Sequence, residues 1–160
     1  MLYDCSPTTE KGSSIAKNLI QNAIISPETV AVIGSTRVSN ANSHRIKIYD
    51  AQIENFILGT PSELDSRTMG YGMVFLHELT HTVLGGNMKD PDSKDSYLPG
   101  ETIEFMNRIR EELDKANNGV QHKTYGKRLS HLGTIENGIV YLPFQDHNNN
   151  KYHITYKYNK

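Results

Sequence analysis

This chain of 160 residues has one cysteine, a net charge close to zero and no long hydrophobic run. Cys5 is the only cysteine, so no disulfide can form within the chain. The formal net charge is −1, so we expect no basic surface for nucleic acid or for an anionic membrane. No apolar stretch is long enough to span a bilayer, and the N-terminal residues lack the apolar segment of a signal peptide. The length fits one folded domain, residues 1–160, large enough to bury a core.

The spacing of apolar residues predicts helices and strands mixed along the chain, which is the α+β class. Apolar residues recur every three or four positions where a helix is expected, and alternate with polar residues where a strand is expected. The predicted helices cover residues 14–25, 68–84 and 101–117, and the predicted strands cover 29–33, 45–49, 52–58, 138–144 and 151–158. The segment 52–58 fits either a further strand or the far arm of a hairpin.

Residues 85–100, between two of the predicted helices, form a loop rich in Gly, Asp, Pro and Ser. The loop is too long for a simple connector, so we expect it to border a cleft. Its Asp90, Asp92 and Asp95 are residues that could bind calcium, but their spacing departs from that of an EF-hand loop. A solvated loop is therefore the favoured interpretation of these three acids.

The helix predicted over 68–84 carries His77-Glu78-Leu79-Thr80-His81, an HExxH motif. Two imidazoles four residues apart project from one face of a helix, so both can bind one Zn²⁺ at about 2.0–2.1 Å. Glu78 lies on the flank of that face, where a carboxylate can reach the metal-activated water as a general base. Gly85-Gly86 follows the motif and is expected to end the helix.

A catalytic zinc site needs a third protein ligand. A glutamate on the following helix is one common choice, and the helix predicted over 101–117 offers Glu104 and Glu101. Glu104 lies one turn inside the helix and is the first choice, whereas a first-turn acid such as Glu101 also has a simple role at the helix dipole. His122 and His131 are the remaining alternatives.

The pattern HExxHxxGxxH is excluded because Leu84 and Asn87 occupy its final Gly and His positions. Zinc hydrolases often add a Tyr, His or Arg that binds the oxyanion. The best candidate segment is Tyr125-Gly126-Lys127-Arg128, with Tyr125 as the catalytic candidate.

Two segments, His77 to Gly86 and Gly100 to Leu113, resemble the metallopeptidase toxin domains at the C-termini of large bacterial Rhs or polymorphic-toxin proteins. They are also similar to zinc-protease effectors that bacteria inject into host cells. The shared features are a His-Glu-Leu-x-His helix and a later helix with Asn-x-Ile-Arg-x-Glu, here Asn107 to Glu112.

The resemblance covers about residues 68–128. It implies a zincin-like fold, a Zn²⁺ cofactor and peptide-bond hydrolysis, with His77 and His81 as ligands and Glu78 as the base. It also implies export as part of a longer protein, and a cognate immunity protein as a partner. The acidic pair that often precedes Asn-x-Ile-Arg in that family is not reproduced, since Leu98-Pro99 stands near that place. The resemblance therefore leaves the third ligand open.

The sequence thus predicts a zinc endopeptidase acting on a protein or peptide. The expected fold is a zincin-like single domain with the HExxH helix, a second ligand-bearing helix and a small antiparallel sheet. An edge strand beside the metal would pair with an extended peptide. The alternative is a non-catalytic zinc-binding interaction module on the same scaffold, and a third hypothesis is hydrolysis of a non-peptide substrate. Glu78 favours an enzyme, because a purely structural zinc site has no use for an uncoordinated carboxylate there.

Overall fold

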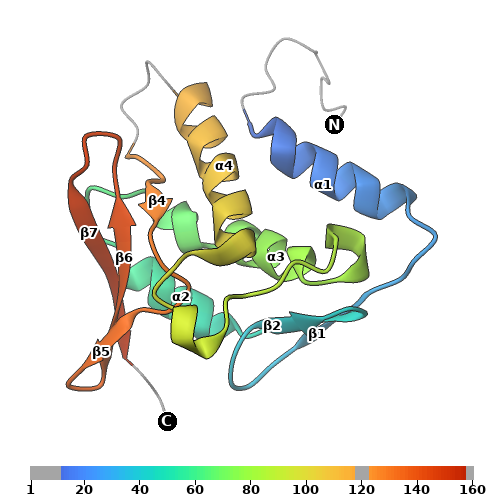
Figure 1. Cartoon of the computed structure of the whole chain (residues 1–160), viewed down its shortest axis with the longest axis horizontal. Helices are drawn as coiled ribbons and strands as arrows, with labels where there is room; N and C mark the ends of the chain where they lie inside the picture. Colours follow the sequence, from blue (N-terminus) through green and yellow to red (C-terminus); the bar gives the residue numbers. More distant parts are fainter. Residues whose placement is uncertain (1–11, 118–122, 158–160) are drawn as a thin grey trace, which may run out of the picture.

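The computed structural model describes residues 12–117 and 123–157, which form helices and two small sheets of the α+β class (Figure 1). The α-helices of the described ranges are α1 (Ser14–Ile25), α2 (Asp50–Leu58), α3 (Tyr71–Thr80) and α4 (Gly100–Ala116). The strands are β1 (Ala31–Gly34), β2 (Asn40–Asn42), β3 (Arg45–Ile48), β4 (Lys127–Arg128), β5 (Thr134–Glu136), β6 (Ile139–Gln145) and β7 (Lys151–Lys157). Short 3₁₀ turns cover Ser66–Met69, Val83–Gly85 and Ser93–Asp95. Among the described residues, no helix is both long and apolar enough to cross a bilayer.

The two sheets lie on opposite sides of the central helices (Figure 1). The N-terminal sheet has the order β1-β3-β2, in which β1 runs parallel to β3 and β2 runs antiparallel to it. This sheet is therefore mixed, so the small antiparallel sheet expected from the sequence corresponds to the C-terminal sheet. The C-terminal sheet is antiparallel, with β6 at its centre between β4, β5 and β7. Strand β2 forms one edge of the N-terminal sheet.

Helix α3 is held from two sides by separate hydrophobic clusters. One cluster joins α2 and the 3₁₀ turn before α3 to the C-terminal sheet, and its members include Ile53, Phe56, Leu142, Phe144 and Ile154. The other joins α1, β3 and α4, and its members include Leu19, Ile46, Met106 and Ile109. Helix α3 contributes Val74 to the first cluster and Met73, Leu76 and Leu79 to the second. Burial on both sides fixes the helix that carries the HExxH motif.

Most predicted elements are found in the structure within a few residues. The helices predicted over 14–25 and 101–117 are α1 and α4, and the strands predicted over 138–144 and 151–158 are β6 and β7. Tyr158, the last residue of that final prediction, lies outside the described residues. The strand prediction for 52–58 is wrong, because this segment is helix α2. Its buried Ile53 and Phe56 are three residues apart and so share one helical face.

The HExxH helix is shorter than the predicted span of 68–84. Gly70, in extended conformation, separates α3 from the preceding 3₁₀ turn, and α3 ends with His81 as its C-cap. Thr82 then caps a second 3₁₀ turn through its side chain. Gly85 sits so close to α3 that an added Cβ would lie 2.1 Å from the carbonyl oxygen of Leu79. The glycine pair therefore reverses the chain beside the helix instead of capping it, with Gly86 at φ 93°.

Candidate metal centre

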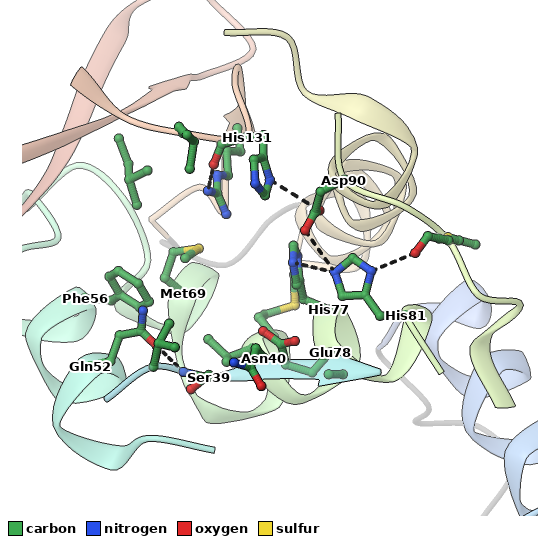
Figure 2. A pocket seen from close by; sticks show the side chains of 18 of the residues that line it. Ser39, Asn40, Gln52, Phe56, Met69, His77, Glu78, His81, Asp90 and His131 are labelled. Carbon is green, nitrogen blue, oxygen red and sulfur yellow. Dashed lines mark hydrogen bonds and ion pairs between the residues drawn. The ribbon is translucent and has the colours of Figure 1, made fainter. Parts of the chain in front are cut away.

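Helix α3 directs its two motif histidines into one cleft with a volume of about 560 Å³ (Figure 2). The Nε2 atoms of His77 and His81 lie 3.3 Å apart. The Nδ1–H of His81 donates a hydrogen bond of 2.7 Å to the main-chain oxygen of Met88. That bond fixes the ring, and because a carbonyl oxygen only accepts, it assigns the proton of a neutral His81 to Nδ1. The lone pair on Nε2 is then directed into the cleft.

The loop after α3 adds a carboxylate to the two histidines. Asp90 places Oδ2 3.5 Å from Nε2 of His81, as Figure 2 shows. The ligand atoms of His77, His81 and Asp90 lie within 4.8 Å of one another, close enough to hold one metal ion. Asp90 comes two residues after Met88, so the loop that orients His81 also supplies the carboxylate.

Two of the three separations in this cluster are close to those of a tetrahedral ion, whereas the third, between His77 and Asp90, is bounded only by the 4.8 Å spread of the cluster. Ligands about 2.0–2.1 Å from a tetrahedral zinc ion lie about 3.3–3.4 Å from one another. The separations of 3.3 Å and 3.5 Å are close to that value. With Nδ1 of His81 protonated, its Nε2 lone pair and the Asp90 carboxylate repel unless a cation or a proton lies between them. Burial, with the nearby Arg128, also holds the pKa of His77 well below its usual value, which keeps this ligand neutral.

Glu78 lines the same cleft and is buried. Within the described part of the chain its carboxylate has no hydrogen-bond or ion-pair partner, which leaves it available to a ligand. Burial, and to a lesser extent the charge of Asp90, raises the pKa of Glu78 to about 8. A divalent cation at the histidines would oppose this shift by favouring the ionised form.

His131 extends the cluster beyond the three ligand candidates. Its Nδ1 lies 3.3 Å from Oδ1 of Asp90, the carboxylate oxygen that does not face His81. That nitrogen is buried and lacks a properly aligned hydrogen bond, the one such side-chain atom among the described residues. Desolvation lowers the pKa of His131. A buried polar atom without a hydrogen bond is costly, so this corner of the cleft fits a site that is completed by a bound group.

The two glutamates expected to supply the third ligand do not approach the histidines. Glu101 and Glu104 are exposed on α4, and Glu104 lines a separate hollow with Lys123 and Gln145. The reason is the helix register, because α4 buries the face that carries Ile103, Met106 and Ile109. The expectation that Glu104 or Glu101 lies beside the histidines is therefore wrong: the carboxylate in the candidate cluster is Asp90, and His122 lies outside the described residues.

Tyr125 does not line the cleft. It is buried, its ring lies beneath the guanidinium of Arg67, and its main-chain oxygen accepts a hydrogen bond from Thr68. The candidate segment 125–128 does reach the cleft, but through Arg128. The oxyanion role expected of Tyr125 therefore has no support in the geometry.

The Asn-x-Ile-Arg segment of α4 holds Arg128 in place. The side chain of Asn107 donates to the main-chain oxygen of Arg128 at 2.8 Å and accepts from its main-chain nitrogen at 2.9 Å. Arg110 donates to Asn107 at 3.2 Å and to the main-chain oxygen of Thr68 at 3.0 Å. These buried bonds join α4 to β4 and to the turn before α3. The segment positions the cleft wall and supplies no acidic ligand.

The sequence held one signal for Asp90, the candidate ligand that was not predicted. The loop of residues 85–100 was expected to border the cleft, and Asn87, Met88, Lys89 and Asp90 do line it. Three acids in a loop directly after an HExxH helix were thus the available indication, although spacing alone does not select Asp90. No protein-family model, curated protein sequence or solved structure matches this chain.

Proposed function

We propose that this protein is a zinc-dependent endopeptidase with His77, His81 and Asp90 as its metal ligands. The observation that carries the proposal is the arrangement on and after α3. Two histidine nitrogens lie 3.3 Å apart, a carboxylate oxygen lies 3.5 Å from one of them, and all three atoms lie within 4.8 Å, which supports one shared metal ion. Two imidazoles and one carboxylate are a ligand set that zinc takes in hydrolases, with a fourth position left for water. Glu78 lies in the same cleft without a partner, which favours catalysis over a purely structural site.

In this proposal each group of the site has a separate chemical role. A bound zinc ion would polarise the scissile carbonyl and increase the acidity of water. Glu78 takes a proton from the attacking water and passes it to the leaving amine. His131 lies against the second carboxylate oxygen of Asp90, with Nδ1 3.3 Å from Oδ1, and so limits the space open to that carboxylate.

A peptide substrate is favoured by the edge strand beside the site. Residues 38–43, which include β2, line the cleft together with the histidines. Because β2 is an edge strand, alternate residues direct main-chain N–H and C=O groups away from the sheet. An extended peptide can bind such an edge by adding a strand. This arrangement of edge strand and HExxH helix is the basis for proposing a zincin-like fold.

The proposal includes a setting, taken from the resemblance of 68–128 to bacterial toxin and effector peptidases. The chain would act as the catalytic part of an exported toxin or effector, and an immunity protein would be its inhibitory partner. The site chemistry stands independently of that setting, because it rests on the residues of the cleft.

The proposal is tested with Glu78→Gln. This variant keeps the size of the side chain but cannot accept a proton, so it should retain zinc and lose essentially all cleavage of a quenched peptide library. Glu104→Gln is the matched control, since the same change on the exposed face of α4 should leave cleavage intact. Cleavage unchanged by Glu78→Gln would refute the mechanism. Stoichiometric zinc without Glu78-dependent cleavage of any library member would favour the non-catalytic interaction module.

A further inference from the structure

Two buried arginines line the cleft beside the metal centre. Arg110 on α4 is 2 % exposed and Arg128 on β4 is 8 % exposed. Arg110 donates to Thr68, Asn107 and the sulfur of Met69. Arg128 donates to the main-chain oxygens of Ser130 and His131. All these acceptors are neutral, and no carboxylate of the described residues pairs with either guanidinium.

Burial of two neighbouring cations without an ion-paired carboxylate is unfavourable, and the charge of Asp90 offsets only part of it at Arg128. Desolvation and the charge of Arg128 lower the pKa of Arg110 to about 9, and desolvation lowers that of Arg128 to about 10. Lys89 is a third cation of the cleft lining, against the two acids Glu78 and Asp90. The lining is therefore cationic even before a divalent metal is added, although the whole chain has a net charge of −1. An anionic ligand would relieve this imbalance.

Arg128 has donors left for such a ligand. Its Nε and Nη2 bond to main-chain oxygens, whereas Nη1 has no partner among the described residues. Among the described residues, His131 Nδ1 is the one fully buried side-chain nitrogen or oxygen without a hydrogen bond. Because Nη1 of Arg128 also lacks a hydrogen bond, it follows that Nη1 is not fully buried. A guanidinium group that faces a cleft with free N–H groups matches the geometry of a carboxylate.

The guanidinium of Arg128 also lies next to the metal ligands. Its Nη2 bonds to the main-chain oxygen of His131, whose ring contacts Asp90. Its charge is the largest electrostatic contribution to the lowered pKa of His77, after desolvation. An anion bound by Arg128 would therefore be close to the reacting bond of a substrate.

We propose that Arg128, with the neighbouring charge of Arg110, binds an acidic side chain of the substrate next to the bond that is cleaved. The inference rests on the proposed function and adds a substrate class, peptides with Asp or Glu flanking the scissile bond. A purely structural Arg128 would only hold the oxygens of Ser130 and His131. An Arg128 that bound only the carbonyl oxygen of the substrate would give no preference for an acidic side chain.

Two small hydroxamates separate these roles by their binding to the zinc-loaded protein, measured by calorimetry. The probes are N-acetyl-glutamyl hydroxamate and N-acetyl-glutaminyl hydroxamate, which share the zinc-binding group and differ in one side-chain charge. The glutamyl probe should bind roughly tenfold more tightly, as expected for one charge-assisted hydrogen-bonded pair. Arg128→Gln should abolish that preference. Arg108→Gln removes the same charge from the exposed side of α4 and should keep it.

Equal affinity of the two probes for the unmodified protein would overturn the proposal, as would a preference that survives in folded Arg128→Gln. The first of these two results can be obtained even where Arg128→Gln does not fold. Failure of the proposed function is a separate result. Absence of Glu78-dependent cleavage leaves a measured preference for the glutamyl probe standing, whereas equal probe binding leaves cleavage standing.

Discussion

Replacing Asp90 with alanine is expected to weaken zinc binding by roughly two to three orders of magnitude. Four-ligand structural zinc sites bind with about 10–16 kcal/mol, so one ligand accounts for about 2.5–4 kcal/mol, or roughly 10²–10³ in affinity. Asp90 is the single carboxylate that lies with His77 and His81 in the ligand cluster of the described residues. Its removal also takes away the group nearest to Nδ1 of His131. No neighbouring acid of that cluster replaces it.

Competition with a chromophoric chelator measures this loss directly. The zinc-dependent rise in melting temperature should also shrink, because a 100-fold weaker affinity removes about 2.7 kcal/mol at saturating zinc. At about 2–4 °C per kcal/mol for a chain of this size, the expected decrease is roughly 5–11 °C. Glu104→Ala and Glu101→Ala on the exposed side of α4 should stay close to the unmodified protein. Unchanged zinc affinity in Asp90→Ala, or an equal loss in Glu104→Ala, would refute the ligand assignment.

Two further predictions concern the elements that hold α4. Asn107→Leu removes the side-chain bonds to both main-chain groups of Arg128, and should lower the free energy of unfolding by about 2–4 kcal/mol, measured in urea; a loss below about 1 kcal/mol would contradict the clamp. Glu112 accepts from the main-chain nitrogen of Ile15 and from Ser13 and Ser14, which lower its pKa from 4.5 to about 2. Its stabilising effect is present above pH 4.5 and is lost as the pH falls toward 2, so Glu112→Gln should be less stable at pH 6 and nearly equal to the unmodified protein at pH 2. An equal difference at both pH values would exclude this origin.

In the elements that were predicted correctly, the apolar residues repeat often enough to distinguish a helix from a strand. Helix α4 repeats Ile103, Met106 and Ile109 at helical spacing, and all three are buried. Strand β7 alternates over its whole length and pairs with β6. The segment 52–58 has the same length as β7, but its cluster of Ile53, Phe56, Ile57 and Leu58 fits either period. Packing against the C-terminal sheet decided that segment in favour of a helix.

Some residues of the candidate site could also be predicted from the sequence, and others could not. His77, Glu78 and His81 could be predicted to share a cleft because a helix fixes their relative positions. Asp90 lies in an irregular loop, whose course depends on the close contact of Gly85 with Leu79 and on the bond from His81 to Met88. Neither interaction has a periodic signature in the sequence. The same reason explains why Arg128, and not Tyr125, faces the cleft.

The loop that carries Asp90 is connected to the segment that carries Arg128 and His131. Residues 96–98 of the loop accept main-chain hydrogen bonds from His131 and Leu132, so the loop that carries Asp90 is joined to the segment that carries His131 and Arg128. Helix α3 carries the other half of the site, and the bond from His81 to Met88 is a direct link between the halves at the site. A metal ion held by His77, His81 and Asp90 would cross-link helix α3 to the loop that carries Asp90. Its removal would leave the bond from His81 to Met88 and the buried bonds from Arg110 to Thr68 as the links that remain near the site.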